Sequence, residues 1–273
     1  MTSPVWLITG ASRGFGKELA LTALQAGARV VATARDQASL QDLASDQCLT
    51  LAQDVADTEQ AKAIVQQAMD AFGQVDVLVN NAGRGLIAPL EETDEATERA
   101  SFDLHYHGPL ALMRAVLPQM RERKAGHIVN ISAAAAHGNY AGFSAYGAPK
   151  AALECACEAL KAEVQPFGIG LTLVVPGPFR TGFIDHAPAP ASVVYANTVG
   201  RFAAWLAKIN GSQPGDPARA AEIIVKLVME GQAPFRLPLG AYAAKKLKDR
   251  AAGAQRDVET WTETAASADF PRA

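Results

Sequence analysis

Short, continuously apolar runs alternate along the chain with longer segments in which apolar residues recur every three or four positions. Continuous runs are typical of strands buried on both faces of a sheet, and the periodic segments are typical of helices packed on it. The alternation predicts an α/β fold with a parallel sheet covered by helices on both faces. Strands are expected at 5–9, 29–34, 49–53, 75–80, 127–132 and 171–175, and helices near 15–26, 37–45, 58–72, 96–123 and 146–167.

The regular alternation ends at Pro176. Residues 178–216 are rich in Pro, Gly and Ala with large apolar side chains interspersed, and a long apolar excursion of this kind is typical of a substrate-binding loop or lid. A helix near 217–230, a short strand at 235–237 and a helix near 240–262 are expected to follow, with a loosely ordered tail at 265–273. No repeat or linker divides the chain, so residues 1–273 are expected to form a single domain.

Composition narrows the possible partners. The 273 residues are 49% apolar and 19% charged, which is enough to bury a core, and 25 basic against 28 acidic side chains leave a net charge of −3. This balance offers no basic surface for nucleic acid or an anionic membrane, and no apolar run is long enough for a membrane span.

Localisation is expected to be cytoplasmic. The first strand begins too early to leave room for a signal peptide, and three cysteines in this pattern indicate reduced thiols. No histidine, cysteine or glutamate set has metal-ligand spacing, so no metal is expected.

A glycine-rich turn joins the first strand to the first helix. Its glycines allow a tight turn and a close approach to a pyrophosphate, and the following helix supplies free N–H groups and a favourable dipole. Its position between strand and helix predicts a dinucleotide site, because the glycine spacing alone would be a weak signal. The expected contacts are Gly10, Ser12, Arg13, Gly14, Phe15 and Gly16.

The end of the second strand favours NADP over NAD. An acidic residue there would bind the ribose hydroxyls of NAD and repel a 2′-phosphate, and Ala34 leaves that position empty. Arg35 and Arg13 provide guanidinium groups that suit a phosphate. Asp36 argues against NADP, unless its carboxylate caps the next helix.

Two further strand ends suit the rest of a dinucleotide. Asp54 and Val55 would provide a carboxylate and an apolar wall for the adenine, and Asn81, Ala82 and Gly83 would allow the ribose to approach closely.

Tyr146 and Lys150 open the helix after the fifth strand. Their spacing of four residues places the phenol and the ammonium on one helical face. A nearby cation favours the phenolate, which would lower the pKa of Tyr146 and suit an acid/base role. The spacing alone is equally compatible with a surface Tyr–Lys pair.

The chain carries four ordered motifs: TGASRGFG at 9–16, NNAG at 80–83, YGAPK at 146–150 and PGPFRT at 176–181. Together they resemble the short-chain dehydrogenase/reductase (SDR) family. The resemblance covers residues 5–240 and implies a single Rossmann-type, doubly wound domain that transfers hydride between NAD(P)(H) and a carbonyl or alcohol, in a homodimer or homotetramer packed through two long helices.

The resemblance also implies residue roles. Tyr146 would donate a proton to the carbonyl oxygen, and Lys150 would bind the nicotinamide ribose and lower the pKa of Tyr146. Thr181, which follows Pro176 and Gly177, would contact the carboxamide.

Two positions depart from the family pattern. The substrate-orienting serine usually lies thirteen residues before the tyrosine, where this chain has Ala133, and the family's helix-borne asparagine falls on His105. Ser132 would substitute only if the strand end bends, since neighbouring strand residues point to opposite faces; otherwise it is expected to bond local backbone. His105 is a candidate for proton relay through a water.

These observations leave three functions open. The favoured one is an NADP-dependent oxidoreductase for a secondary alcohol or ketone, with an apolar substrate suggested by residues 183–206. Ala133 and His105 also allow a catalytically impaired dinucleotide-binding sensor or interaction protein, or non-redox proton chemistry on the same fold.

Overall fold

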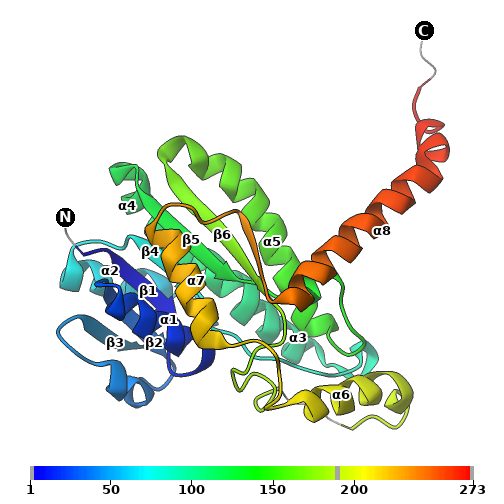
Figure 1. Ribbon diagram of the computed structural model, residues 1–273, viewed down its shortest axis with the longest axis horizontal. Helices are drawn as coiled ribbons and strands as arrows, with labels where there is room; N and C mark the ends of the chain where they lie inside the picture. Colours follow the sequence, from blue (N-terminus) through cyan, green and yellow to red (C-terminus); the bar gives the residue numbers. More distant parts are fainter. Residues whose placement is uncertain (1–2, 188–190, 271–273) are drawn as a thin grey trace.

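The computed structural model describes residues 3–187 and 191–270, and Figure 1 shows one sheet with helices on both faces. The sheet has seven strands in the order β3-β2-β1-β4-β5-β6-β7, and each neighbouring pair is parallel. This arrangement confirms the predicted doubly wound fold. The strands are β1 (Val5–Thr9), β2 (Arg29–Ala34), β3 (Cys48–Ala52), β4 (Val77–Asn80), β5 (Gly126–Ile131), β6 (Ile169–Pro176) and β7 (Arg236–Leu239).

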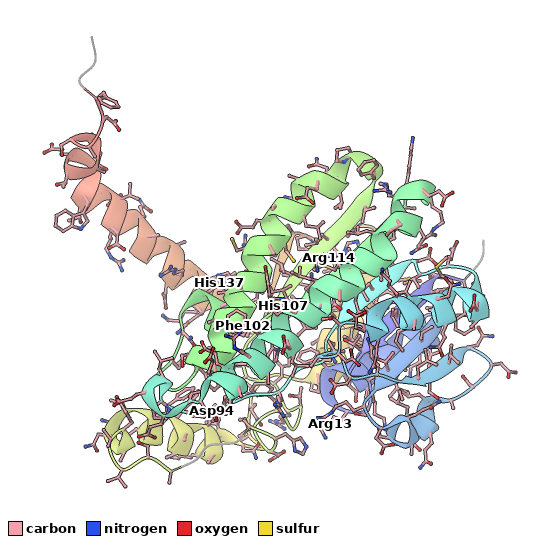
Figure 2. The ribbon with its side chains drawn as sticks, turned by 180° about the vertical axis from the view of Figure 1, so that it is seen from behind. Arg13, Asp94, Phe102, His107, Arg114 and His137 are labelled. Carbon is pink, nitrogen blue, oxygen red and sulfur yellow. The ribbon has the colours of Figure 1, made fainter. Side chains whose placement is uncertain are left out.

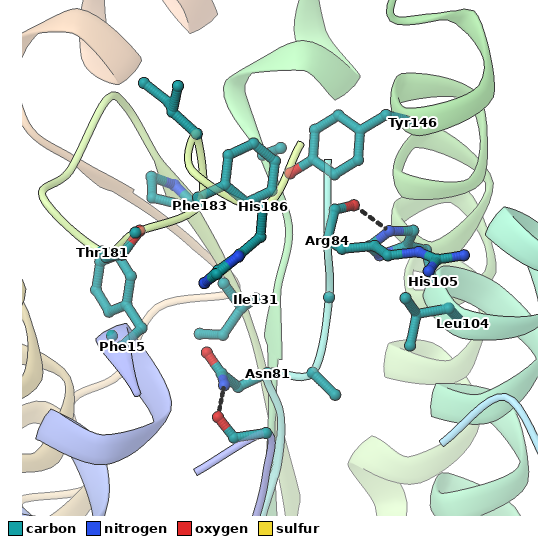
Figure 3. Close-up of a pocket in the computed structure, with 18 of the residues that line it drawn as sticks. Phe15, Asn81, Arg84, Leu104, His105, Ile131, Tyr146, Thr181, Phe183 and His186 are labelled. Carbon is teal, nitrogen blue, oxygen red and sulfur yellow. Dashed lines mark hydrogen bonds between the residues drawn. The ribbon is translucent and has the colours of Figure 1, made fainter. Parts of the chain in front are cut away.

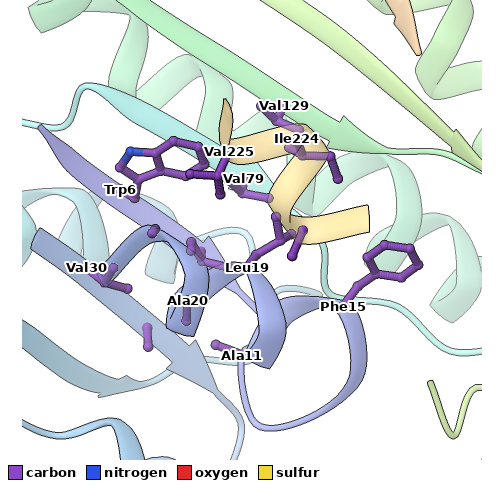
Figure 4. Close-up of a cluster of buried hydrophobic side chains, with 14 of the residues drawn as sticks. Trp6, Ala11, Phe15, Leu19, Ala20, Val30, Val79, Val129, Ile224 and Val225 are labelled. Atoms are coloured by element: carbon purple, nitrogen blue, oxygen red, sulfur yellow. The ribbon is translucent and has the colours of Figure 1, made fainter. Parts of the chain in front are cut away.

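Alternate side chains of the buried strands point to opposite faces of the sheet. Trp6 and Ile8 of β1 pack in the core beneath helices α1 and α7, whereas Val5 and Leu7 pack beneath α2, α4 and α5 (Figure 4 shows the first core). Burial on both faces is why the strands read as continuous apolar runs. The α-helices are α1 (Gly14–Gln25), α2 (Gln60–Phe72), α3 (Glu95–Phe102), α4 (Gly108–Arg123), α5 (Ser144–Val164), α6 (Arg201–Ile209), α7 (Pro217–Met229) and α8 (Ala241–Ala266).

Two segments expected to be single α-helices have a different form. The segment expected to be one helix over 96–123 is α3 and α4 joined by a π-helical turn, η3 (Asp103–His107). The segment expected at 37–45 is a 3-10 helix, η1 (Gln37–Leu43). Single π-helical turns are frequent at functional sites, and η3 carries His105.

The C-terminal region also differs in detail. Helix α8 continues beyond the expected end near 262, so part of the tail predicted at 265–273 is helical. Residues 271–273 of that tail lie outside the described residues, as do residues 188–190 of the segment 178–216. Within that segment the structure contains a π-helical turn, η6 (Ala196–Gly200), followed by α6.

The three cysteines form no disulfide. Cys48 and Cys157 are buried, and burial raises the pKa of their thiols to about 11 and about 12, whereas Cys155 is exposed on α5. In the part of the chain that the structure describes, no three His, Cys, Asp or Glu side chains gather as a metal site. None of the helices described there has the length and apolar character needed to cross a membrane.

A buried histidine on β5 is expected to make the fold sensitive to acid. The ring of His127 lies 2.9 Å from the Thr172 hydroxyl, and burial lowers its pKa from 6.5 to about 4. Between these two values the unfolded chain binds a proton that the folded chain resists, so stability falls as the pH falls through this window. The loss due to this residue is at most about 3 kcal/mol.

His127→Gln is therefore expected to flatten the dependence of the unfolding free energy on pH between pH 6.5 and pH 4, measured by urea denaturation. The control is His107→Gln, because His107 is exposed. An unaltered slope in His127→Gln would contradict this assignment.

Candidate active site

A cavity of about 720 Å³ opens where β1, β4, β5 and β6 end. This is the edge at which parallel α/β sheets bind ligands. With the exception of Gly16, every site residue predicted from the sequence lines this cavity. Figure 3 shows part of the wall, where Asn81, Ile131 and Tyr146 come from different elements.

The glycine turn forms one end of the cavity. Gly14 has a φ of 55°, and a Cβ added there would lie 2.8 Å from the carbonyl oxygen of Thr181, so a side chain at this position would be strained and crowded. Gly16 lies behind the turn against the Gly10 carbonyl, which explains its absence from the cavity wall.

Helix α1 presents its N-terminus to this end of the cavity. Its N-cap residue, Arg13, makes no side-chain capping bond, so no side chain caps its first N–H groups. Ser12, Arg13, Gly14 and Phe15 line the cavity beside it. Free N–H groups and a helix dipole suit a pyrophosphate, so these residues fit the phosphate end of a dinucleotide.

Two arginines stand next to the glycine turn without an ion-pair partner in the described chain. Arg13 and Arg35 are both exposed and line the cavity. The carboxylate of Asp36 accepts a hydrogen bond of 3.0 Å from the Ala38 amide and caps η1, as the sequence allowed. The Asp36 carboxylate is thus used to cap η1, whereas the guanidinium groups of Arg13 and Arg35 are available to bind a phosphate.

The other predicted dinucleotide residues combine cavity lining with structural bonds. The Asn81 amide donates to the carbonyl oxygens of Thr9 at 2.8 Å and Gly10 at 3.2 Å, which ties β4 to the glycine turn. The Asp54 carboxylate accepts from the Ala56 amide at 3.0 Å, and Val55 beside it is buried.

Tyr146 and Lys150 are buried side by side on the first turns of α5. The Lys150 ammonium donates a 2.7 Å hydrogen bond to the Ile131 carbonyl at the end of β5. Burial lowers the pKa of Lys150 to about 8, against the opposing effect of the Glu154 charge. Burial also raises the pKa of Tyr146, whereas the sequence suggested that Lys150 would lower it. Tyr146 is therefore a neutral phenol at neutral pH.

Glu154 lies one further turn along α5 and organises a buried polar cluster. The Ser132 hydroxyl donates to its carboxylate, His137 Nε2 lies within 3.0 Å, and Arg236 Nε donates at 3.2 Å. Burial alone would raise the pKa of Glu154. The hydrogen bonds and the neighbouring charges have a larger effect in the opposite direction, so the pKa of Glu154 is below its ordinary value. Ser132 thus bonds a side chain of α5 rather than local backbone.

His105 lies beside the tyrosine on the π-helical turn η3. Its ring packs edge-on against Tyr146 with 5.3 Å between centroids, and its Nε2 lies 2.9 Å from the Arg84 carbonyl. Because a carbonyl only accepts, Nε2 carries the proton and Nδ1 has a free lone pair. Nδ1 is buried with no hydrogen-bond partner among the described residues, and burial holds the pKa of His105 well below its usual range.

The far half of the cavity has an aromatic wall. Phe143 and Phe183 flank Tyr146, with ring centroids 5.1 Å and 5.3 Å away. The sequence pointed to 183–206 for such residues, but exposed Val193 and Val194 of that segment do not line the cavity. The other wall residues are Tyr140, Ile184, Phe202, Trp205, Leu206 and Tyr242.

Two parts of this site were missed from the sequence. Tyr140 and Tyr242 are far apart along the chain, and no local pattern brings them together, although their hydroxyls form a hydrogen bond. Glu154 could have been found, because the four-residue spacing of Tyr146 and Lys150 continues to it.

Comparison with known proteins gives consistent matches. The family model described as short chain dehydrogenase matches residues 4–190. The 3-ketodihydrosphingosine reductase of Bacteroides thetaiotaomicron is 34% identical over 248 residues, which are 88% of this chain and 89% of that protein.

Solved structures agree with this match. A short-chain dehydrogenase from Streptomyces avermitilis superposes with a TM-score of 0.89 at 39% identity, covering 98% of this chain and 99% of its own. A metagenomic short-chain oxidoreductase in complex with NADP is 34% identical with a TM-score of 0.62, covering 66% of this chain and 85% of its own. Together with the glycine turn and the uncapped N-terminus of α1 at one end of the cavity, these matches support a nicotinamide cofactor. The chain belongs to the short-chain dehydrogenase/reductase family of oxidoreductases.

Proposed function

We propose that this protein is an NADP(H)-dependent oxidoreductase that interconverts an apolar ketone and its secondary alcohol. The observation that carries the proposal is the content of one cavity. It combines the glycine turn and two arginines that form no ion pair among the described residues at one end, Tyr146 and Lys150 in the middle, and an aromatic wall at the other end. A dinucleotide and an apolar substrate could therefore bind on either side of the acid/base group in the same cavity.

The residues present fit the cofactor. Arg13 and Arg35 would hold the 2′-phosphate, the glycine turn the pyrophosphate, and Lys150 the nicotinamide ribose. When bound, the nicotinamide supplies or accepts the hydride. Asp54 and Val55 would contact the adenine, and Asn81, Ala82 and Gly83 would lie against the ribose. Thr181, which follows the further proposed contacts Pro176 and Gly177, would contact the carboxamide.

Tyr146 is the proposed acid/base. In the reducing direction its neutral phenol donates a proton to the substrate oxygen, and in the oxidising direction the phenolate takes the proton back. Lys150, held by the Ile131 carbonyl, places a positive charge near the phenolate as it forms. His105 supports the tyrosine ring from its edge and remains neutral.

The proposed substrate class rests on the cavity wall. Phe143 and Phe183 flank the phenol, and Phe202 and Trp205 continue the aromatic wall from Phe143. Such a wall suits an apolar group next to the carbonyl. Residues 178–216 would then be the substrate-binding segment of a single catalytic domain. The Bacteroides relative is named for the reduction of a keto compound, which agrees with this class.

A second candidate is favoured by one specific observation. Ala133 offers no hydrogen-bond donor to a substrate oxygen, and the nearby Ser132 hydroxyl donates to Glu154 instead. A dinucleotide-binding protein with impaired turnover would have this arrangement. Oxidation of NADPH with a panel of apolar ketones, followed at the nicotinamide absorbance band, tests the two functions directly.

Ala133→Ser is expected to raise turnover in that assay. It restores a donor next to Tyr146, and such a donor contributes about 10²–10³-fold where nothing replaces it. Turnover by the wild type, further increased in Ala133→Ser, supports the oxidoreductase. Turnover by Ala133→Ser alone supports the impaired binding protein, and no turnover by either rejects the proposed reaction.

The cofactor preference has its own test. Arg13→Ala and Arg35→Ala are each expected to weaken NADPH binding about 10-fold or more, because a charge-assisted bond to the phosphate is lost. NADH binding should change little. Dissociation constants from nicotinamide fluorescence would show the difference, with Arg99→Ala, on the exposed face of α3, as the control. Equal effects on both cofactors would contradict the proposed 2′-phosphate site.

A further inference from the structure

The outer part of α8 leaves the body of the protein. The first turns of α8 are anchored by buried Ala243 and by Lys246, whose ammonium lies 4.2 Å from the ring centroid of Tyr140. Beyond Lys246, the helix projects away from the sheet, as Figures 1 and 2 show from opposite sides. We call residues 247–266 the arm.

The arm has few contacts that would stabilise it as a helix. Apart from Ala243, the described part of α8 contains no buried residue, and the side-chain hydrogen bonds of the arm stay within the helix. Helices in proteins owe most of their stability to packing of an apolar face against other elements, and Gly253 in the interior of the arm weakens the helix further. A partner that covers one face would supply the missing stabilisation.

The arm has one apolar face with a strict heptad pattern. Val258 and Trp261 are 67% and 61% exposed, which is unusual for such large apolar side chains. The spacing along this face alternates between three and four residues, as in the seam of a coiled coil, and no polar residue interrupts it. The seam begins at Ala244, one turn before the arm, and continues through Leu247, Ala251, Ala254, Val258, Trp261 and Ala265.

We propose that the arm pairs antiparallel with the arm of a second copy of this chain. In this register Leu247 faces Val258 of the second copy, and Ala244 leaves room for Trp261 of the second copy. At the centre, Ala251 of each copy faces Ala254 of the other, and these small side chains allow the two helices to approach closely. Each large residue thus lies opposite a smaller one.

Charges beside the seam select the antiparallel orientation. Arg250 and Asp257 occupy equivalent flanking positions one heptad apart, and neither forms an ion pair among the residues that the structure describes. Antiparallel pairing brings Arg250 opposite Asp257 of the second copy on both sides of the two-fold axis. Parallel pairing would place these charges beside Gln255 and Thr262, which are uncharged.

The polar face disfavours a membrane surface. The arm carries Lys248, Arg250 and Arg256 against Asp249, Asp257, Glu259 and Glu263, so basic residues are not in excess. Helices that lie on anionic membranes are rich in lysine and arginine on the polar face.

Cysteine cross-linking tests the register in the full chain. The background is Cys155→Ser, which removes the exposed native thiol. In this background, Leu247→Cys combined with Val258→Cys is expected to give a covalent dimer under mild oxidation. The two positions are about 16 Å apart within one helix, too far for an internal disulfide. Val258→Cys alone should remain uncross-linked, since antiparallel arms keep its two copies a similar distance apart.

The possible outcomes are distinct. Failure of the double variant to cross-link overturns the proposal, and efficient cross-linking of Val258→Cys alone overturns it in favour of parallel arms. Cross-linking of the double variant alone supports it.

Sedimentation tests the same pairing without cysteines. Val258→Glu is expected to weaken association at least 10-fold, whereas Thr260→Glu, which adds the same charge off the seam, should not. Arg250→Asp should also weaken association, and Arg250→Asp combined with Asp257→Arg should restore it. A wild-type chain that sediments as a monomer, or an assembly unchanged by Val258→Glu, overturns the proposal, because association through other helices would be insensitive to the arm.

Discussion

Tyr146→Phe is expected to lower kcat for ketone reduction by about 10²–10⁴-fold, the usual contribution of a positioned acid. The change removes only the hydroxyl. The ring keeps its contacts with Phe143, His105 and Phe183, so the cavity should retain its shape. NADPH affinity, measured by fluorescence in the same preparation, should be largely unchanged.

Tyr140→Phe is the matched control. Tyr140 also lines the cavity, but its hydroxyl bonds the Tyr242 hydroxyl, and its ring stacks on Phe202 with 4.9 Å between centroids. We expect this variant to keep most of the activity. Full turnover by Tyr146→Phe on a substrate that the wild type reduces would show that another group supplies the proton.

Glu154→Ala is expected to destabilise the fold by about 3–5 kcal/mol, the usual cost of removing one partner from a buried charged cluster. Glu154 is only 4% exposed. Its loss would leave Ser132, His137 and Arg236 without their shared acceptor. For a domain of this size the melting temperature should fall by about 10 °C.

Glu158→Ala provides a direct comparison for Glu154→Ala. Glu158 pairs with the same Arg236, but its side chain is 56% exposed, so we expect a loss of at most about 1 kcal/mol. Calorimetry of both variants at the same pH would show whether burial decides the cost. Similar losses in the two variants would mean that Arg236, rather than the buried cluster, dominates.

The fold was predictable because the sheet is buried on both faces. Val5–Thr9 and Arg29–Ala34 read as continuous apolar runs for that reason, and the strands expected there have the same bounds in the structure. The π-helical turn at His105 was not predictable, since apolar spacing across a helix of 96–123 does not show where one extra residue enters a turn.

The candidate site was predictable in its members but less so in its energetics. Side chains at the carboxyl ends of parallel strands must meet at one edge, so a single cavity collects almost all of the expected residues. The predicted direction of the Tyr146 pKa shift was wrong, because a spacing of four residues does not reveal how deeply Tyr146 and Lys150 are buried. The partner of Ser132 depended on a contact with α5 that no local pattern encodes.

The two ends of the cavity draw on different parts of the chain. The glycine turn, Arg35 and Asn81 precede the midpoint of the sequence, whereas Phe183, Trp205 and Tyr242 of the aromatic wall come after β6. Under the proposed function, mutations of Phe183, Trp205 or Tyr242 would change which molecules are accepted and leave Tyr146 and Lys150, the proposed acid/base pair, in place. A lineage with this layout can diversify its substrates by drift in one region, and a protein engineer can restrict a library to the same region.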